Sequence, residues 1–268
     1  MSQSLKNLSV QPEVLRSGDT GEKLAALEEL LEIACKCREK TDAVQRTARA
    51  APSVRKYYRP WHEFREIVGE PVFAALEDIV QDTAPSEVRA RAGDIMAQVW
   101  HPCAIGRLLE TFEERRETKA DLPSSGIFRN LGGIGTEAAA RALMWLWGSG
   151  FDAEAAGALG MCESDAAQEF LLGNALRHSS PYVRSVCIAH LNPPVTEEKI
   201  ALLINRLETG TQNEQFIAAM KVKELRAARA VPALLALRAG NTDMVLVKII
   251  DEALAVLKAG RPPALRSR

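Results

Sequence analysis

The chain has 268 residues, of which 47% are hydrophobic but only 5% aromatic, and its 34 basic and 35 acidic residues leave a formal net charge of -1. Ala and Leu supply much of the hydrophobic content, which favours helices over strands. The near-zero charge excludes a global electrostatic field that would draw the protein onto nucleic acid or an anionic membrane, so such binding would need a local basic patch.

The five cysteines are odd in number and scattered through apolar stretches, which indicates reduced thiols and not a disulfide framework. The first ten residues lack a basic segment followed by an apolar one, and no window of about eighteen residues is apolar throughout. We therefore expect a cytoplasmic protein with no membrane-spanning segment.

Residues 1–69 are expected to form an N-terminal helical cap followed by a basic linker. Within them, Asp19 to Lys40 has leucines at helical spacing and acidic residues concentrated in its first half, as in a well-capped amphipathic helix. Thr41 to Pro60 is basic and poor in large apolar residues, which predicts a looser helix or a linker. Residues 261–268, rich in Pro and Arg, are expected to be a frayed tail.

Residues 70–260 contain a repeated pattern of two amphipathic helices in steps of about thirty residues. Ser86 and Asp165 are expected to cap helices, and Pro181 and Pro232 stand where the first turn of a helix tolerates proline. One such helix pair cannot bury its apolar face alone, so neighbouring pairs must stack. The first helices of the pairs are expected to start near Pro71, Cys103, Thr136, Asp165, Thr196 and Arg229.

Two segments carry a family resemblance: Asn130 to Ala139 (NLGGIGTEAA) and Leu225 to Leu235 (LRAARAVPALL) resemble the repeat of HEAT and PBS-lyase-type HEAT-like proteins. The resemblance extends over residues 70–259 and implies an all-α fold, a right-handed α-solenoid of about six helical hairpins. It implies little about function, because such repeats occur in scaffolds, bilin lyase subunits, transport factors, toxin-neutralising proteins and some DNA glycosylases. In this family an Arg at the start of the second helix bridges neighbouring repeats, a role that the resemblance implies for Arg89 and Arg184.

A basic and aromatic segment, from Arg46 to Trp61, is the most distinctive local feature of the sequence. It belongs to a stretch from Arg38 to Arg59 in which basic residues outnumber acidic ones. Such a composition suits a protein contact surface and also phosphate contact with base stacking. From Glu63 to Asp94 the balance inverts to acidic, so internal neutralisation between the two stretches is a third interpretation. The candidate partner-binding residues in this segment are Arg46, Arg49, Arg55, Lys56, Tyr57, Tyr58, Arg59 and Trp61.

Motifs for catalysis or metal binding are weak, and we expect no catalytic residues, metal or cofactor. The glycines from Leu131 to Gly135 lack the Lys-Ser/Thr of a phosphate loop and are interpreted as a turn between helices. Cys35 and Cys37 would point about 200° apart on a helix and cannot chelate one ion together. The histidines His62, His101, His178 and His190 are expected to have structural roles.

Three hypotheses follow, and the first is a non-enzymatic scaffold or adaptor that binds a protein partner through its concave face and the basic segment. The second is a nucleic-acid binder related to the HEAT-like DNA glycosylases, in which Trp145 or Trp147 with Glu137 or Asp152 would hold a damaged nucleotide. The third, a bilin lyase subunit, would need one reactive cysteine. Membrane binding is not expected.

Overall fold

The computed structural model describes residues 10–47, 60–81, 84–118 and 124–259. These residues form fifteen α-helices and two short 3-10 helices, and no strand occurs among them, which confirms the all-α class. None of the described helices combines the length and apolarity that crossing a bilayer would require. The chain divides into two compact units, Met1–Ile134 (unit 1) and Gly135–Arg268 (unit 2), and the expected boundary after residue 69 falls inside unit 1.

Unit 1 is built around one long helix, α2, which packs along α6 and also contacts α1 and α4. Helix α5 packs on α1, α4 and α6, and the chain continues through α7 to α8. The helices of unit 1 are α1 (Pro12–Ser17), α2 (Thr20–Thr47), α4 (Pro60–Val68), α5 (Glu70–Gln81), α6 (Ser86–Gln98), η2 (Pro102–Ala104), α7 (Ile105–Thr118) and α8 (Ser124–Ile134). The predicted helix from Asp19 is confirmed, but it continues to Thr47, so residues 41–47, which were expected to belong to a looser helix or linker, belong to α2.

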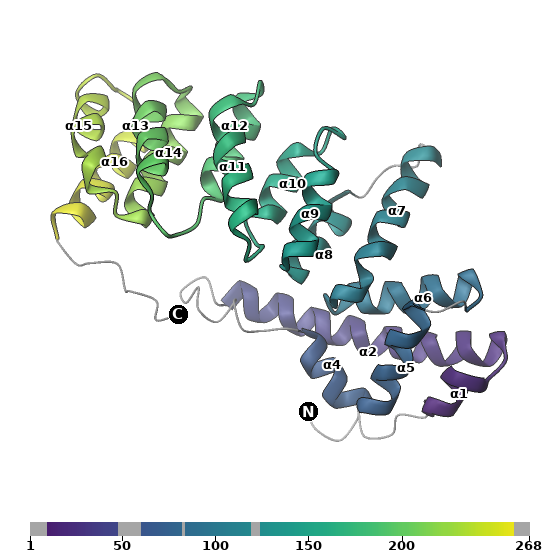
Figure 1. Ribbon diagram of the computed structural model, residues 1–268. Helices are drawn as coiled ribbons and strands as arrows, with labels where there is room; N and C mark the ends of the chain where they lie inside the picture. Colours follow the sequence, from purple (N-terminus) through teal and green to yellow (C-terminus); the bar gives the residue numbers. More distant parts are fainter. Residues whose placement is uncertain (1–9, 48–59, 82–83, 119–123, 260–268) are drawn as a thin grey trace. The chain divides into compact units, whose positions relative to one another are not determined.

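Unit 2 consists of consecutive helix pairs that stack in chain order (Figure 1). Its helices are α9 (Glu137–Trp145), α10 (Asp152–Leu159), α11 (Asp165–Arg177), α12 (Pro181–Ala189), α13 (Glu197–Thr209), α14 (Gln212–Leu225), η3 (Ala228–Ala230), α15 (Val231–Ala239) and α16 (Met244–Lys258). Helices α9, α11, α13 and α15 contact one another in sequence and form row A. Helices α10, α12, α14 and α16 do the same and form row B, and α9–α10, α11–α12, α13–α14 and α15–α16 each close a hairpin.

The sequence pattern locates these helix starts well. The first helices of the pairs begin at Glu70, Pro102, Glu137, Asp165, Glu197 and Ala228, where the short 3-10 helices η2 and η3 are included. Each lies within one residue of the expected start, because the pattern of apolar residues and breakers marks helix boundaries. Pro181 and Pro232 do occupy the first turn of their helices.

Two expected caps are wrong. Ser86 lies inside the first turn of α6, after Pro85, which makes no side-chain cap, and α11 is capped by Ser164 and not by Asp165. Thr136, Thr196 and Thr211 cap other helices, and Thr211 forms a reciprocal capping box with Glu214. Caps of this kind contribute about 1 kcal/mol each, so they help to define where each helix of unit 2 begins.

The core of unit 2 consists of Leu, Ile and Ala side chains from both rows. The large members Leu171, Leu203, Leu234 and Ile250 have no exposed surface. Burying one such side chain stabilises a fold by about 1.5–3 kcal/mol, and each hairpin obtains that burial from its neighbours. The hairpins of unit 2 are therefore interdependent, and their outward surfaces are held in a fixed register.

Candidate functional site

Among the predicted contact residues, the structure describes the side chain of Trp61 only. The side chain of Arg46, together with Arg49, Arg55, Lys56, Tyr57, Tyr58 and Arg59, lies outside the described part of the chain. Trp61 is partly buried on α4, where its ring centroid lies 3.7 Å from His62 and 5.3 Å from His101. Trp61 thus packs within unit 1, which leaves only part of its indole for a partner.

Two other basic residues of the same stretch have partners inside unit 1. Arg38 is 8% exposed, its guanidinium lies 4.2 Å from the Trp100 ring centroid, and it donates to Asn130 Oδ1 at 3.1 Å. Lys40 forms an ion pair with Glu63, which joins the basic stretch to the acidic stretch that follows it. The Lys40–Glu63 pair is one case of the expected neutralisation between the basic and acidic stretches. The contacts of Arg38 give it a structural role.

Arg184 and Arg89 have different environments. Arg184 of α12 donates to Glu214 of α14 at 2.7 and 3.3 Å, and to the His178 carbonyl at 2.8 Å, so it joins two hairpins. Arg89 of α6 is exposed, and no ion pair or hydrogen bond links its side chain to another described residue.

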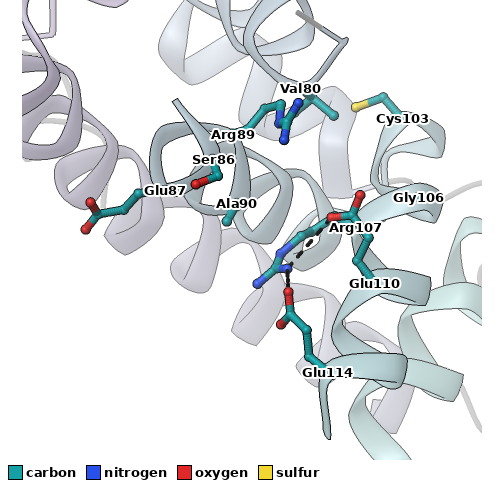
Figure 2. Close-up of a pocket in the computed structure, with 10 residues that line it drawn as sticks. All are labelled: Val80, Ser86, Glu87, Arg89, Ala90, Cys103, Gly106, Arg107, Glu110 and Glu114. Carbon is teal, nitrogen blue, oxygen red and sulfur yellow. Dashed lines mark hydrogen bonds and ion pairs between the residues drawn. The ribbon is translucent and has the colours of Figure 1, made fainter. Parts of the chain in front are cut away.

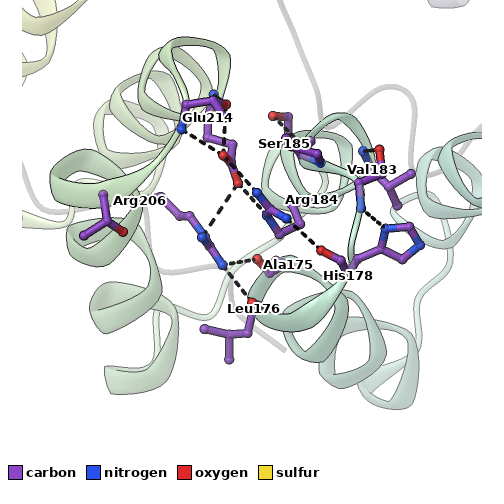
Figure 3. A network of polar contacts seen from close by, with 12 residues as sticks. Ala175, Leu176, His178, Val183, Arg184, Ser185, Arg206 and Glu214 are labelled. Carbon is purple, nitrogen blue, oxygen red and sulfur yellow. Dashed lines mark hydrogen bonds and ion pairs between the residues drawn. The ribbon is translucent and has the colours of Figure 1, made fainter.

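A buried polar network surrounds Glu214, which is 1% exposed (Figure 3). Arg206 of α13 lies 3.8 Å from Glu214 and donates to the carbonyls of Ala175 and Leu176, at the end of α11, at 3.0 and 2.8 Å. Burial opposes ionisation of Glu214, but hydrogen bonds from Arg184 and Thr211 more than offset it and lower its pKa to about 2. The carboxylate is therefore ionised at neutral pH and links three consecutive helices of unit 2 with α11.

A hollow of about 460 Å³ opens in unit 1 between α5, α6 and α7 (Figure 2). Its lining residues are Val80, Ser86, Glu87, Arg89, Ala90, Cys103, Gly106, Arg107, Glu110 and Glu114. The Arg107 guanidinium is held by Asp94 at 3.3 Å and Glu114 at 3.0 Å, so much of the charge in the hollow is compensated internally. The mixture of opposite charges does not form a set of convergent donors for an oxyanion.

Cys103, which lines the hollow, is followed by His101 and then Glu77 in a row of contacts. This is the order of a nucleophile, a base and an orienting acid. His101 Nδ1 lies 3.0 Å from Cys103 Sγ, and His101 Nε2 lies 3.4 Å from Glu77 Oε1. Burial raises the pKa of the Cys103 thiol to about 12, and burial with the nearby Arg65 lowers the pKa of His101 to about 4. Formation of the Cys103 thiolate is therefore strongly opposed, and Cys103 and His101 form a neutral hydrogen-bonded pair at pH 7.

Cys103 is accordingly expected to alkylate slowly. With a thiol pKa of about 12, its reaction with iodoacetamide at pH 7.5 should be on the order of a thousand-fold slower than that of a free thiol of ordinary pKa. Mass spectrometry of peptides over time measures this rate, with the partly exposed Cys35 and the urea-unfolded chain as references. Fast labelling of folded Cys103 would show that His101 acts as its base.

The tryptophans that a glycosylase would use do not share a pocket with a free carboxylate. Trp145 is 62% exposed, whereas Trp147 packs edge-to-face on Phe170 and His178. Asp152 Oδ2 lies 3.2 Å from His178 Nε2, and Glu137 accepts a hydrogen bond from the Ser164 hydroxyl. Both candidate acids are thus engaged in contacts within unit 2.

Both rows of unit 2 expose large apolar side chains: Trp145, Leu176 and Leu235 on row A, and Tyr182, Met220, Met244 and Val245 on row B. On row B, exposed or partly exposed apolar side chains recur from helix to helix, and we call them the row B stripe: Tyr182, Val186, Ile217, Met220, Val245 and Ile249. Exposed positions on row A include Glu137, Arg141, Glu169, Glu198 and Glu208. Sequence analysis missed the stripe, although the i, i+4 spacing of Tyr182 and Val186 on α12 is a signal for it.

The described residues contain no group of three His, Cys, Asp or Glu side chains placed to hold a metal ion. The row B stripe lies in unit 2, whereas the basic segment that was predicted as a contact surface belongs to the sequence of unit 1. Comparison of the chain with models of known protein families finds no match, and comparison with curated proteins finds none either.

Proposed function

We propose that this chain is a non-enzymatic protein–protein interaction module, an adaptor or scaffold of the HEAT-like α-solenoid class. Helix pairs that begin within one residue of the expected positions support the repeat class, as does the packing of unit 2 into two rows. The electrostatics of Cys103 and His101, which oppose a nucleophilic thiolate, favour a binding role over thiol chemistry.

The observation that carries this proposal is the apolar stripe of row B. Tyr182, Met220 and Val245 are 65%, 44% and 63% exposed, on three consecutive helices of that row. Helices α12, α14 and α16 pack side by side, and exposed apolar side chains that gather on neighbouring elements mark surfaces that bind partners. The partner is a protein that presents apolar side chains to this stripe, and its contact adds to that of the basic segment.

The charges beside the stripe favour a protein over a polyanion. Lys223 pairs with Glu252 at 2.6 Å, Lys221 pairs with Glu224 at 2.8 Å, and Arg184 pairs with Glu214. Binding of nucleic acid depends on cations that are available to neutralise phosphates. These three cations of row B already have carboxylates, so they offer little to a polyanion.

A triple change of Tyr182, Met220 and Val245 to Glu is expected to weaken partner binding by at least ~100-fold, because it removes apolar contact and places charges in the interface. The three side chains are exposed, so the fold should tolerate the changes. The partner is first captured from extracts of the native cell and identified, and its dissociation constant is then measured by calorimetry.

The matched control changes three exposed apolar residues of row A, Trp145→Glu, Leu176→Glu and Leu235→Glu, and should keep the wild-type affinity. Unchanged affinity of the row B triple variant would contradict the proposal for this surface. Mobility shifts of DNA and RNA at ~50 and ~200 mM salt test the alternative, since phosphate-driven binding should fall by orders of magnitude between them.

A further inference from the structure

His101 occupies an enclosed position in unit 1 where three helices meet. It lies between the end of α6 at Gln98 and the start of η2 at Pro102. Its backbone is fixed because its N–H donates to the Met96 carbonyl at 2.9 Å and its carbonyl accepts from Ala104 N–H at 3.1 Å. Its ring packs edge-to-face on Trp61 of α4 and on Phe73 of α5, with both centroids at 5.3 Å. The side chain of His101 is 12% exposed. The imidazole therefore cannot swing into water without separating these rings.

Helix α4 depends on such contacts. It has nine residues, which is too short for a helix to be stable in water by itself. Phe64 and Val68 bury its inner face, and Trp61 extends the contact to His101. The loss of the Trp61 contact would thus weaken the attachment of the whole first turn of α4.

We propose that His101 is an acid-sensitive latch that holds α4 in unit 1 while its imidazole is neutral and releases α4 when the ring gains a second proton. In the neutral form, Nε2–H faces Glu77 and Nδ1 accepts from the Cys103 thiol, so both ring nitrogens are satisfied. Protonation puts a second N–H against the thiol, which is a weak acceptor, and places a charge on a side chain that is only 12% exposed.

The groups around the imidazole of His101 shift its pKa in opposite directions. Arg65 of α4 opposes protonation, Glu77 of α5 favours it, Cys103 of η2 is a neutral thiol, and the imidazole of His62 stacks on Trp61. Among the described contacts of the ring, α6 supplies no charged group. Burial outweighs the carboxylate of Glu77, and the pKa of His101 falls to about 4.

The direction of the pH effect follows from that value. In the released state the imidazole regains its ordinary pKa of about 6.5, so protons bind the released state more tightly. Release of α4 therefore increases as pH falls below about 6.5 and stops increasing below about 4. Between pH 7.5 and pH 5 the equilibrium constant for release is expected to rise about 30-fold.

Hydrogen exchange of the full chain, corrected for the intrinsic effect of pH, tests the latch. Peptides covering α4 are expected to show the rise of about 30-fold, whereas peptides covering α16 in unit 2 should not. His101→Gln should abolish most of this rise. His62→Gln, a change on α4 itself, should keep it. Glu77→Gln should leave the rise between pH 7.5 and pH 5 almost unchanged and should extend it below pH 4, because the carboxylate that favours protonation is lost.

The proposal is overturned if α4 and α16 respond equally to pH, or if His101→Gln keeps the full rise. If that variant does not fold, an NMR titration of His101 in the unaltered chain decides. A pKa below 5 supports the latch, and a pKa near 6.5 overturns it, because the folded protein would then gain the proton without cost.

Discussion

Replacing Glu214 with Gln is expected to destabilise unit 2 by about 3–5 kcal/mol, the range found when one partner of a buried ion pair is removed. Arg184 and Arg206 are 16% and 12% exposed, and both lie within 4 Å of the Glu214 carboxylate. Gln keeps the shape of Glu but carries no charge, so two mostly buried guanidinium groups lose the anion that compensates them. Urea unfolding followed by circular dichroism measures the change.

The matched control is Glu252→Gln, which removes a carboxylate of the same row from an ion pair with Lys223. Both partners of that pair are more than a third exposed and are screened by solvent, so its loss should cost far less than the loss of the buried Glu214 carboxylate. If the two variants were equally stable, the Glu214 network would contribute no more than a surface ion pair, and the hairpins of unit 2 would be held by apolar packing alone.

The pH dependence of the stability of Glu214→Gln provides a second measurement. The pKa of Glu214 is about 2 in the folded chain and about 4.5 in the unfolded chain. The stability that its ionised form contributes is fully present above about pH 4.5 and is lost as pH falls towards 2. Glu214→Gln should lack this part of the acid-induced loss in unit 2.

Helix positions were predictable from the sequence because they depend on local information. Breakers such as Pro181 and capping residues such as Thr196 mark boundaries that neighbouring helices do not change. The glycines before Gly135 were predicted as a turn, and this was wrong: Gly132 and Gly133 belong to the last turn of α8, and Gly135, with a φ of 67°, makes the turn. Packing against Trp100 explains Gly133, and no sequence pattern reveals that contact.

The site was less predictable because it depends on contacts between distant residues. Arg184 and Glu214 are thirty positions apart, and His101 meets Trp61 and Glu77 from two other helices. The basic segment was prominent in the sequence because its charges are adjacent, yet Arg38 and Lys40 proved to have partners in unit 1. Composition shows which charges are present but not which of them are already paired.

The buried network and the row B stripe are connected in the structure. Arg184 stands two residues after Tyr182 on α12, and Glu214 stands three residues before Ile217 on α14. The ion pair therefore fixes the spacing of two helices that carry the stripe. A rigid surface loses less conformational entropy on binding than a flexible one, so the network that stabilises unit 2 would also favour the proposed binding by its stripe.

Replacing Gly133 with Ala is expected to destabilise unit 1 by roughly 1–3 kcal/mol, the usual range for overpacking a core. An added Cβ would lie 2.2 Å from Trp100 Cε2. The ring has little freedom to move: it is 3% exposed, Arg38 covers it, its Nε1 donates to Asn130 at 3.3 Å, and its backbone φ is 61°.

The matched control is Gly126→Ala on the same helix, where an added Cβ has no atom within 4 Å. That change should stabilise α8 by up to about 1 kcal/mol, because Ala has the higher helix propensity. The two substitutions are chemically identical, so opposite signs in urea unfolding isolate the contact with Trp100. Trp100→Phe combined with Gly133→Ala should recover part of the loss, since the smaller ring leaves room for the methyl group. Stabilisation by Gly133→Ala alone would show that α8 packs farther from α6 than this contact requires.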